Sequence, residues 1–536
     1  MTTRRRLLGW LGAATGLVVA PAAGFAGYLW ADSGRSNVGT LGFRNRLPIP
    51  PLLPPAVDAD GRRRFRLTLA PGRTELLPGT STITWGANGP ILGPTLRVRR
   101  GERVAVDVTN RLPETTSMHW HGMHLPAAMD GGPHQPVAPG RTWQPYWTVE
   151  QRAATLWYHP HLHRHTAAHV YRGVAGLFLV DDDESDALPL PRRYGVDDIP
   201  LILQDRKLHD DGTLDESGLA FGGFSVTGLL GDRILVNGGY DPYLEVGDEL
   251  VRFRLLNGAN ARVFSVGFAD DREFSLVATD AGIRDAPLPL RRLMLSPGER
   301  AEIVVRFRPG EAVLLRGFPA PMGGNALIRR LAGGADTFDL VRIVAAPALR
   351  PSPALPSRLA AAAPPSASPT PPPSLPAPTL SASPTAPPSL PVPSRGEPYR
   401  MTMGDFRFDE RVMDLTRIDR VVRAGSVETW EIANTGGIPH NFHVHGASFH
   451  LLDVDGRPPA SQLTGEKDTV YVPPGGRLRL AVRFLAHSDP RTPYMFHCHL
   501  LAHEDAGMMG QFITVSARDE SQVPAELSGA HPGHGK

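Results

Sequence analysis

The sequence predicts an all-β protein built from three consecutive Greek-key β-sandwich domains. A segment of alternating apolar and polar residues runs from Gly101 to Asn110, and the pattern returns at 247–257 and 425–434. Alternation with a period of two is typical of a strand with one buried face. A Pro-Gly turn and a further strand follow each copy, without long helical periodicity, which indicates three related β domains. The three turns are Pro139-Gly140, Pro297-Gly298 and Pro474-Gly475.

Composition divides the rest of the chain. Between residues 347 and 398, eighteen of the fifty-two residues are Pro, with Ser, Ala and Thr between them. Such a segment lacks the apolar surface needed to fold, so we expect a disordered linker; a Pro-rich ligand for a partner module is the alternative. The expected divisions are 1–35 for a signal or anchor segment, 40–185, 190–346 and 399–520 for the three sandwiches, 347–398 for the linker, and 521–536 for a disordered tail.

The amino terminus carries an export signal. Arg4 and Arg5 precede an apolar run from Leu7 to about Leu29, which is the arrangement of a twin-arginine signal. We therefore expect the twin-arginine export machinery as a partner, and an extracytoplasmic location, secreted or attached to the cell envelope. The small residues at 20–22 offer a cleavage site, but the run is nearly long enough to remain as a membrane anchor. The formal net charge of +2 gives no indication of a nucleic-acid partner.

The chain contains a single cysteine, Cys498, so no intramolecular disulfide is possible. It stands between His497 and His499, with His503 and Met508 a few residues on. In an extended strand the thiol would face one way and the two flanking imidazoles the other. One Cys, two His and a weak axial Met form the ligand set of a blue copper site. The alternative is a buried, inert cysteine beside ordinary histidines.

Histidines supply the rest of a copper-binding pattern. Four His-x-His pairs place both imidazoles on one face of a strand, two pairs in the first repeat and two in the third. Imidazole suits copper, and eight such ligands could hold three copper ions. His440 adds the second imidazole that the Cys498 site needs. The pairs are His119/His121, His159/His161, His443/His445 and His497/His499.

The four histidine motifs together resemble the copper signatures of the multicopper oxidases, in particular those of three-domain bacterial laccases with cupredoxin domains. The resemblance covers about residues 40–346 and 399–516. It implies cupredoxin-like sandwiches and, since all twelve ligand positions are filled, a copper-loaded protein. The motifs are His119-Trp-His121-Gly, Trp157-Tyr-His159-Pro-His161, His440-Asn-Phe-His443-Val-His445-Gly and His497-Cys-His499-Leu-Leu-Ala-His503.

The resemblance also implies a role for each ligand. The blue copper would be held by His440, Cys498, His503 and Met508, with Met509 as the competing candidate for the axial position. A cluster of three copper ions would be held by His119 and His443 on a single ion, and by His121, His159 and His499 and by His161, His445 and His497 on a coupled pair. Asp130 and Glu504 match acidic residues that deliver protons; a hydrogen bond that orients a ligand imidazole is the compatible alternative.

The implied activity is that of a laccase-like oxidase with four copper ions. Single electrons from a phenolic or other aromatic donor would enter at the blue copper and pass through Cys498 to its neighbours His497 and His499. O2 would be reduced to water at the cluster. Oxidation of cuprous or ferrous ion, serving copper tolerance, is the alternative. Family members dedicated to cuprous ion often carry a Met-rich insertion, whereas the large insertion before the third repeat contains no Met. A non-catalytic copper-binding or scaffold protein of the cell envelope is a more remote alternative.

Overall fold

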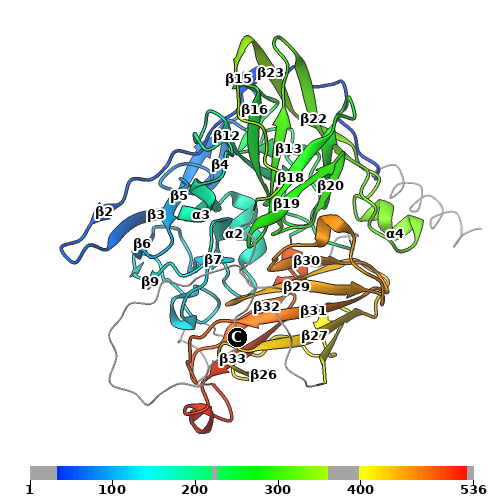
Figure 1. Cartoon of the computed structure of the whole chain (residues 1–536). Coiled ribbons are helices and arrows are strands. Elements are labelled where there is room, and N and C mark those ends of the chain that lie inside the picture. Colours follow the sequence, from blue (N-terminus) through cyan, green and yellow to red (C-terminus); the bar gives the residue numbers. More distant parts are fainter. Residues whose placement is uncertain (1–32, 220–225, 360–396, 528–536) are drawn as a thin grey trace, which may run out of the picture.

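The computed structural model describes residues 33–219, 226–359 and 397–527. The predicted signal segment up to residue 32, linker residues 360–396 and tail residues 528–536 lie outside these ranges. Within them, no helix is both long enough and apolar enough to cross a bilayer. Three sandwiches, each of two packed sheets, follow one another along the chain (Figure 1), which confirms the all-β prediction.

The first sandwich packs a sheet of six strands against a sheet of four around one apolar core. The six strands are β2 (Ala56–Val57), β3 (Arg63–Thr74), β4 (Thr82–Ala87), β6 (Arg103–Asn110), β8 (Thr142–Trp143) and β9 (Tyr146–Thr148). The four strands are β5 (Leu96–Arg99), β7 (His119–His121), β10 (Ala154–His159) and β11 (Gly176–Asp181). Three short helices, η1 (Ala127–Met129), α2 (Thr166–Arg172) and α3 (Asp183–Asp186), complete this part.

The second sandwich contains a sheet of six strands, one of them from the amino-terminal segment, and a sheet of seven. The first consists of β1 (Asn45–Arg46), β15 (Pro242–Asp248), β17 (Phe264–Phe268), β20 (Arg292–Leu295), β22 (Ala312–Phe318) and β23 (Phe338–Arg350). The second consists of β12 (Asp198–Arg206), β13 (Arg233–Val236), β14 (Gly239–Tyr240), β16 (Leu250–Asn257), β18 (Phe274–Thr279), β19 (Gly282–Leu290) and β21 (Arg300–Arg306). Helix α4 (Ala326–Leu331) lies between β22 and β23.

The third sandwich packs two sheets of five strands around a core that includes Cys498. One sheet holds β24 (Tyr399–Gly404), β25 (Arg407–Phe408), β27 (Val427–Asn434), β29 (Ala447–Val454) and β31 (Arg477–Phe484). The other holds β26 (Arg420–Arg423), β28 (His440–Val444), β30 (Thr469–Val472), β32 (Tyr494–His497) and β33 (Met509–Val515). The helices are η2 (Ser461–Leu463), α5 (Leu501–Asp505) and η3 (Glu520–Gln522).

The repeat seen in the sequence corresponds to a repeated contact. The three related strands β6, β16 and β27 end at Asn110, Asn257 and Asn434. Each of these side-chain amides donates to the backbone carbonyl two residues before the proline of the Pro-Gly turn of its own domain, at Val137, Leu295 or Val472. The same residue at the same strand end therefore anchors the Pro-Gly turn in all three sandwiches.

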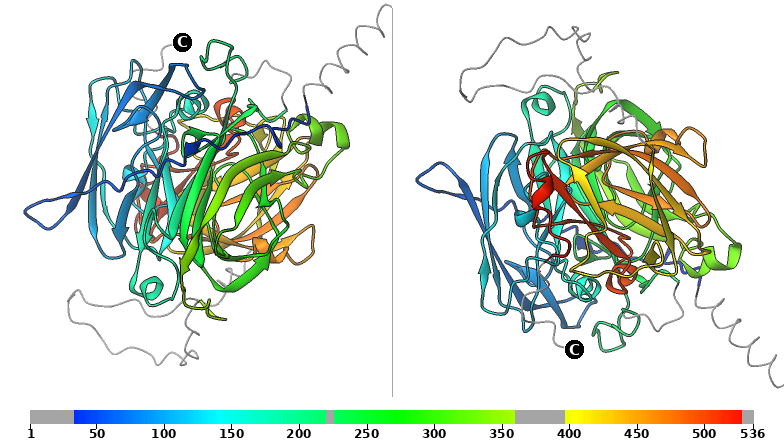
Figure 2. Two further views of the ribbon diagram at one scale, coloured as in Figure 1. Left: turned by 90° about the horizontal axis from the view of Figure 1, so that it is seen from above. Right: turned by 90° about the horizontal axis from the view of Figure 1, so that it is seen from below.

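The amino-terminal segment belongs to a different sandwich from the one predicted. β1 pairs in parallel with β15, and Ser36 bridges to Thr337, so this segment runs across the second sandwich (Figure 2, dark blue). The prediction assigned residues 45–46 to the first domain, which was predicted to begin at residue 40. This assignment is wrong, because they belong to a sheet of the second sandwich. Their sequence carries no signal for this pairing, because the partner strand lies almost 200 residues away.

The predicted linker begins too early. Residues 347–350 continue β23, where Pro347 is exposed at a register shift and Arg350 pairs with Asp248. Leu359 is only 4% exposed, packs with Leu190 and Leu250, and donates its backbone N–H to Asp285. Proline content misled the prediction, since an exposed Pro at an irregular edge does not end a strand.

The predicted tail also begins too early. Residues 521–522 lie in η3, and Leu527 is 5% exposed in a cluster with Ile513 and Val515. Its backbone N–H donates to Thr416. Leu527, together with the partly buried Val523, packs this segment against the third sandwich.

Leu359→Ala should lower the free energy of unfolding by about 2 to 3 kcal/mol, because it empties a buried site. Leu327→Ala is the matched control: Leu327 is 50% exposed, and its truncation should cost less than about 0.5 kcal/mol. Calorimetric unfolding of both variants tests this prediction. Equal shifts would mean that Leu359 does not belong to the folded core.

Candidate metal centre

Four residues of the third sandwich form what we call the blue site: His440, Cys498, His503 and Met508. Cys498 Sγ lies 3.7 Å from His440 Nδ1 and 3.6 Å from His503 Nδ1, and these two nitrogens are 3.0 Å apart. Three elements supply them, since His440 opens β28, Cys498 follows the last residue of β32, and His503 lies in α5. His503 Nε2 donates to the Val226 carbonyl at 3.1 Å, which leaves Nδ1 as a lone pair directed at the thiol.

The surroundings of Cys498 keep its thiol inert in the absence of a cation. The side chain is fully buried, and burial raises the pKa of Cys498 to about 12. Its thiol donates to Asn441 Oδ1 at 3.5 Å, and the same oxygen accepts the backbone N–H of His499 at 2.6 Å. At neutral pH the thiolate therefore forms only when a bound cation compensates its charge.

The structure separates the two candidate axial methionines. Met508 belongs to the apolar cluster that contains Cys498, whereas Met509 packs with Met413 and Met495 in another cluster. The backbone N–H of Cys498 donates to the Met508 carbonyl at 3.1 Å. Successive side chains near the start of a strand point to opposite sides, so only one of the two thioethers faces the blue site. This packing favours Met508.

Met508→Gln should lower the reduction potential of the blue copper, because an amide oxygen stabilises the cupric state more than a thioether does. Met508→Leu should raise it, since no axial ligand remains. The same changes at Met509 are the control and should shift the potential much less. Redox titration of the blue absorption decides between them: equal shifts at both positions, or none at Met508, would identify the wrong axial residue.

Eight buried histidines form a second group, which we call the cluster site. In the first sandwich, strand register sets His119 opposite His159; in the third it sets His443 opposite His497. Two stacked pairs then join the sandwiches: the rings of His119 and His445 are 3.8 Å apart, and those of His121 and His443 are 3.7 Å apart. The members are His119, His121, His159, His161, His443, His445, His497 and His499.

The imidazole nitrogens of the cluster site converge. His161 Nε2 and His445 Nε2 each lie 3.1 Å from His497 Nε2. Seven further nitrogens are buried and have no hydrogen-bond partner within the described ranges. These seven are His119 Nε2, His121 Nδ1, His159 Nε2, His161 Nδ1, His443 Nε2 and both ring nitrogens of His499.

On three of these histidines the opposite ring nitrogen is held by a backbone carbonyl. His119 Nδ1 donates to the Asp130 carbonyl at 3.0 Å, His159 Nδ1 to Pro160 at 2.8 Å, and His443 Nδ1 to Asp468 at 2.8 Å. One nitrogen fixed by a carbonyl and the other left as a lone pair is the usual arrangement of a metal-ligating imidazole. The residues present therefore fit copper.

The protonation states agree with this fit. Burial and neighbouring imidazoles hold the pKa values of the cluster histidines His121, His159, His443 and His445 well below the ordinary range. Burial lowers the pKa of His503, in the blue site, to about 3. A histidine with a lowered pKa is neutral at pH 7, which is the form that binds a metal ion.

Asp130 and Glu504 each contact two cluster histidines. Asp130 Oδ2 accepts from His445 Nδ1 at 2.7 Å, while its backbone carbonyl accepts from His119. Glu504 lies 3.1 Å from His497 Nδ1 and 3.4 Å from His161 Nδ1. Burial opposes ionisation of Glu504, but these two histidines hold the pKa of its carboxyl below its ordinary value. Both carboxylates are thus placed to orient ligands and to exchange protons beside them.

Sequence reasoning missed the residues that form hydrogen bonds with the candidate ligands and fix their positions. Asp468 holds His443 through its backbone carbonyl, and its Oδ1 lies 3.2 Å from His121 Nε2. Asn441 Oδ1 accepts from the Cys498 thiol and from the His499 backbone N–H, and its side-chain NH2 donates to the Pro297 carbonyl of the second sandwich. Asn441 follows His440 directly within one of the four histidine motifs, so the sequence offered a signal for it. Asp468 lies at no regular spacing from a histidine pair, so the sequence offered no signal for it.

Comparison with known proteins gives consistent matches. Residues 68–185 and 384–518 each match a family model described as multicopper oxidase. The chain is 31% identical to the multicopper oxidase mco of Staphylococcus aureus, over 89% of this chain and 94% of that protein. It is 35% identical to the cell division protein FtsP of Salmonella typhimurium, with the same coverage. The crystal structure of a laccase from Pediococcus acidilactici matches with a TM-score of 0.75 at 33% identity, over 89% of this chain and 94% of that one. The chain therefore belongs to the multicopper oxidase family.

Proposed function

We propose that this protein is a laccase-like oxidase that takes single electrons from a phenolic or other aromatic donor at the blue site and reduces O2 to water at the cluster site. The observation that carries the proposal is the completeness of both sites. Ten imidazoles, one thiol and one thioether are buried in two groups. Cys498 of the blue site stands between His497 and His499 of the cluster site, so three consecutive residues join the two groups covalently.

The proposal assigns four copper ions to each chain. His119 and His443 would hold a single ion through the Nε2 atoms that have no other partner in the described ranges. The converging Nε2 atoms of His161, His445 and His497 would hold a second ion, and the blue site another. His121, His159 and His499 would hold the remaining ion of the coupled pair. Bound copper would supply the one-electron redox chemistry and the site for O2.

Residues of two sandwiches border the blue site at the edge where electrons would enter. His503 contacts the Val226 carbonyl and, at a ring separation of 4.7 Å, the side chain of Phe406. From the blue site, electrons would pass from Cys498 through a few covalent bonds to the imidazoles of its neighbours His497 and His499. Burial of His503, Cys498 and the two imidazoles keeps water away from this path.

Reduction of O2 to water also consumes protons, and we assign their delivery to Asp130 and Glu504. They contact different pairs of cluster histidines: Asp130 contacts His445 and His119, and Glu504 contacts His497 and His161. Neither carboxylate needs to move to reach a ligand imidazole. Each carboxylate could take up a proton and pass it on beside a proposed ligand.

The donor class is tested by oxygen uptake of the copper-loaded protein with a diphenol, with cuprous ion and with ferrous ion. The similarity to a laccase supports the diphenol as the fastest donor. Faster uptake with either metal ion would replace the aromatic donor by a metal-ion oxidase function. Uptake with none of the three would overturn the proposed oxidase activity.

A second candidate function comes from the relatives named cell division protein FtsP. A protein acting only through binding would not need the full ligand set. Metal analysis of the purified, folded chain separates the two: about four copper ions per chain support the oxidase, and a folded chain that takes up none supports a binding function.

We also propose that the chain is exported by the twin-arginine route, from Arg4 and Arg5, which lie outside the described residues. This route can carry a folded, metal-loaded chain. Replacing both with Lys should retain the protein in the cytoplasm, and normal export of that variant would refute the assignment.

A further inference from the structure

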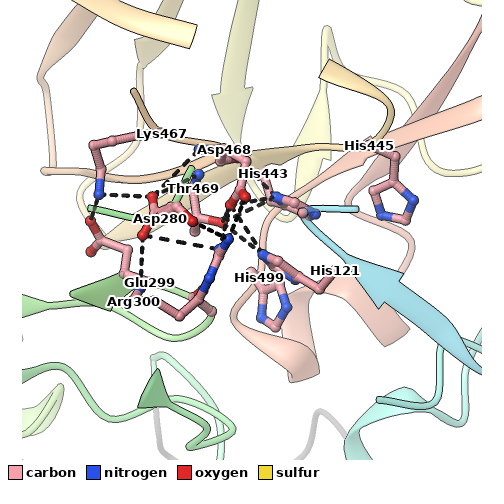
Figure 3. Close-up of polar contacts among 12 residues, drawn as sticks. His121, Asp280, Glu299, Arg300, His443, His445, Lys467, Asp468, Thr469 and His499 are labelled. Atoms are coloured by element: carbon pink, nitrogen blue, oxygen red, sulfur yellow. Dashed lines mark hydrogen bonds and ion pairs between the residues drawn. The ribbon is translucent and has the colours of Figure 1, made fainter. Parts of the chain in front are cut away.

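The second sandwich supplies no proposed copper ligand, yet one of its side chains contacts the support of two cluster histidines (Figure 3). Arg300, the first residue of β21, is fully buried. Its NH1 and NH2 groups each lie 2.6 Å from a different carboxylate oxygen of Asp468 in the third sandwich. This two-pronged geometry fixes the plane of the carboxylate, which a Lys ammonium could not do.

Asp468 transmits this position to the ligands. Its Oδ1 lies 3.2 Å from Nε2 of His121, and its backbone carbonyl accepts from Nδ1 of His443 at 2.8 Å. Thr469 adds a hydroxyl at 3.1 Å from each of these two ring nitrogens. The other ring nitrogens of these two histidines, His121 Nδ1 and His443 Nε2, face the cluster site. They have no hydrogen-bond partner in the described parts of the chain.

Further hydrogen bonds hold Arg300 in place, among them one from NH1 to the Gly298 carbonyl at 3.2 Å. Its Nε donates to the Thr155 carbonyl of the first sandwich at 3.0 Å, and NH2 donates to the Asp280 carbonyl at 2.9 Å. The backbone N–H of Arg300 donates to the Asp280 carboxylate at 2.7 Å. Lys467 in turn lies 2.8 Å from Asp280 and 3.0 Å from Glu299. The position of the Arg300 guanidinium is therefore fixed independently of Asp468.

Two glycines allow this close packing. A Cβ on Gly122, directly after His121, would lie 2.6 Å from both Arg300 NH2 and Asp468 Oδ2. A Cβ on Gly298 would lie 3.0 Å from the ring of His499 and 3.2 Å from that of His121. The turn before β21 and the turn after β7 are thus shaped around the ion pair and the ligands together.

We propose that Arg300 of the second sandwich is a positioning residue for the cluster site, acting through Asp468 to fix the orientation of His121 and His443. This inference rests on the proposed copper function, because those two histidines are the ligands it orients. It gives a defined role to the sandwich that supplies no ligands, since the geometry of the single ion and of one ion of the coupled pair depends on a side chain from that domain. Residues that orient ligands in this way typically change metal affinity or activity by about 10- to 100-fold when replaced.

Arg300→Gln is the test variant, with Arg254→Gln as its matched control. Arg254 is also a buried arginine of the second sandwich, 2.7 Å from Asp198 and 2.9 Å from Glu302, but its partners are these two carboxylates and Thr155 rather than Asp468 or a proposed ligand. Both changes leave buried carboxylates without their partner and should lower thermal stability. Only the first should alter the cluster site.

The measurements are the electron paramagnetic resonance signal of the single cluster copper, the rate at which a chelator removes copper, and the blue absorption. Arg300→Gln should change the resonance signal and weaken retention of cluster copper by about 10- to 100-fold, while the blue absorption per chain stays that of the wild type. Arg254→Gln should match the wild type in all three. A wild-type signal and wild-type retention in Arg300→Gln, or equal effects in Arg254→Gln, would overturn the inference.

Asp468→Asn covers the case in which Arg300→Gln does not fold. It keeps an oxygen that can accept from His121 but removes the charge that binds Arg300, and it should shift the same resonance signal. A wild-type signal in this variant would also overturn the inference. The two proposals fail differently: a folded wild-type protein without cluster copper overturns the proposed function and this inference with it, whereas an unchanged variant of a copper-loaded wild type overturns this inference alone.

Discussion

Cys498→Ser should eliminate the intense blue absorption of the copper-loaded protein and reduce donor oxidation to the background rate. The chain contains no other cysteine, so no second thiolate can replace the lost one. A serine hydroxyl remains protonated at neutral pH and does not form the strong charge-transfer bond to copper. Absorption spectroscopy and oxygen uptake on the same preparation measure both effects.

The internal control for this variant is the cluster site. His497 and His499 keep their backbone positions, because the His499 N–H still donates to Asn441. Copper at the cluster site should therefore remain, and its resonance signal should match that of the wild type. A Cys498→Ser protein that is blue and active would refute the assignment of the blue site.

Glu504→Gln should slow oxygen uptake by about a hundredfold, because the amide cannot take up a proton and pass it on beside His497 and His161. Copper content and blue absorption should stay unchanged, since the amide oxygen can still accept one hydrogen bond. Burial disfavours the charged carboxylate and the two histidines favour it, with a pKa below the ordinary value as the net result. The lost function is therefore that of an ionised group that takes up and passes on protons.

Asp505→Asn is the matched control for Glu504→Gln. Asp505 is the next residue of α5, and its carboxylate accepts the backbone N–H groups of Thr166 and Ala167 rather than an imidazole N–H. Its replacement should affect stability while turnover stays near that of the wild type. Equal losses in both variants would show that damage to α5, and not proton delivery, explains the effect.

Most of the strands could be predicted from local pattern. Leu478, Leu480, Val482 and Phe484 occupy every second position of β31, with Arg at three of the positions around them, and all four are buried. Such alternation reflects burial within one strand, so neighbouring residues contain the necessary information. The pairing of β1 with β15 and the packing of Leu359 depend instead on partners far away in the chain. The residues around β1 and Leu359 in the sequence give no information about these distant partners.

The candidate ligands could be recognised from sequence because each motif is a short contiguous stretch of the chain. The support around them could not. Arg300 and Asp468 are 168 residues apart, and Asp468 and His121 are 347 apart. Their contact exists only once three sandwiches have packed together, with a buried charge pair whose partners come from different domains. A lone Arg or Asp in a sequence is far more often a solvated surface residue.

The measurement that tests the central claim most directly is the number of electrons taken from a one-electron donor for each O2 consumed by the copper-loaded protein. The proposed function predicts four donor molecules oxidised per O2, with no oxygen released when catalase is added afterwards. The ratio and the activity should both disappear with the copper. A ratio of two, with oxygen returned by catalase, would mean that the product is hydrogen peroxide and would contradict reduction to water at a cluster of three copper ions.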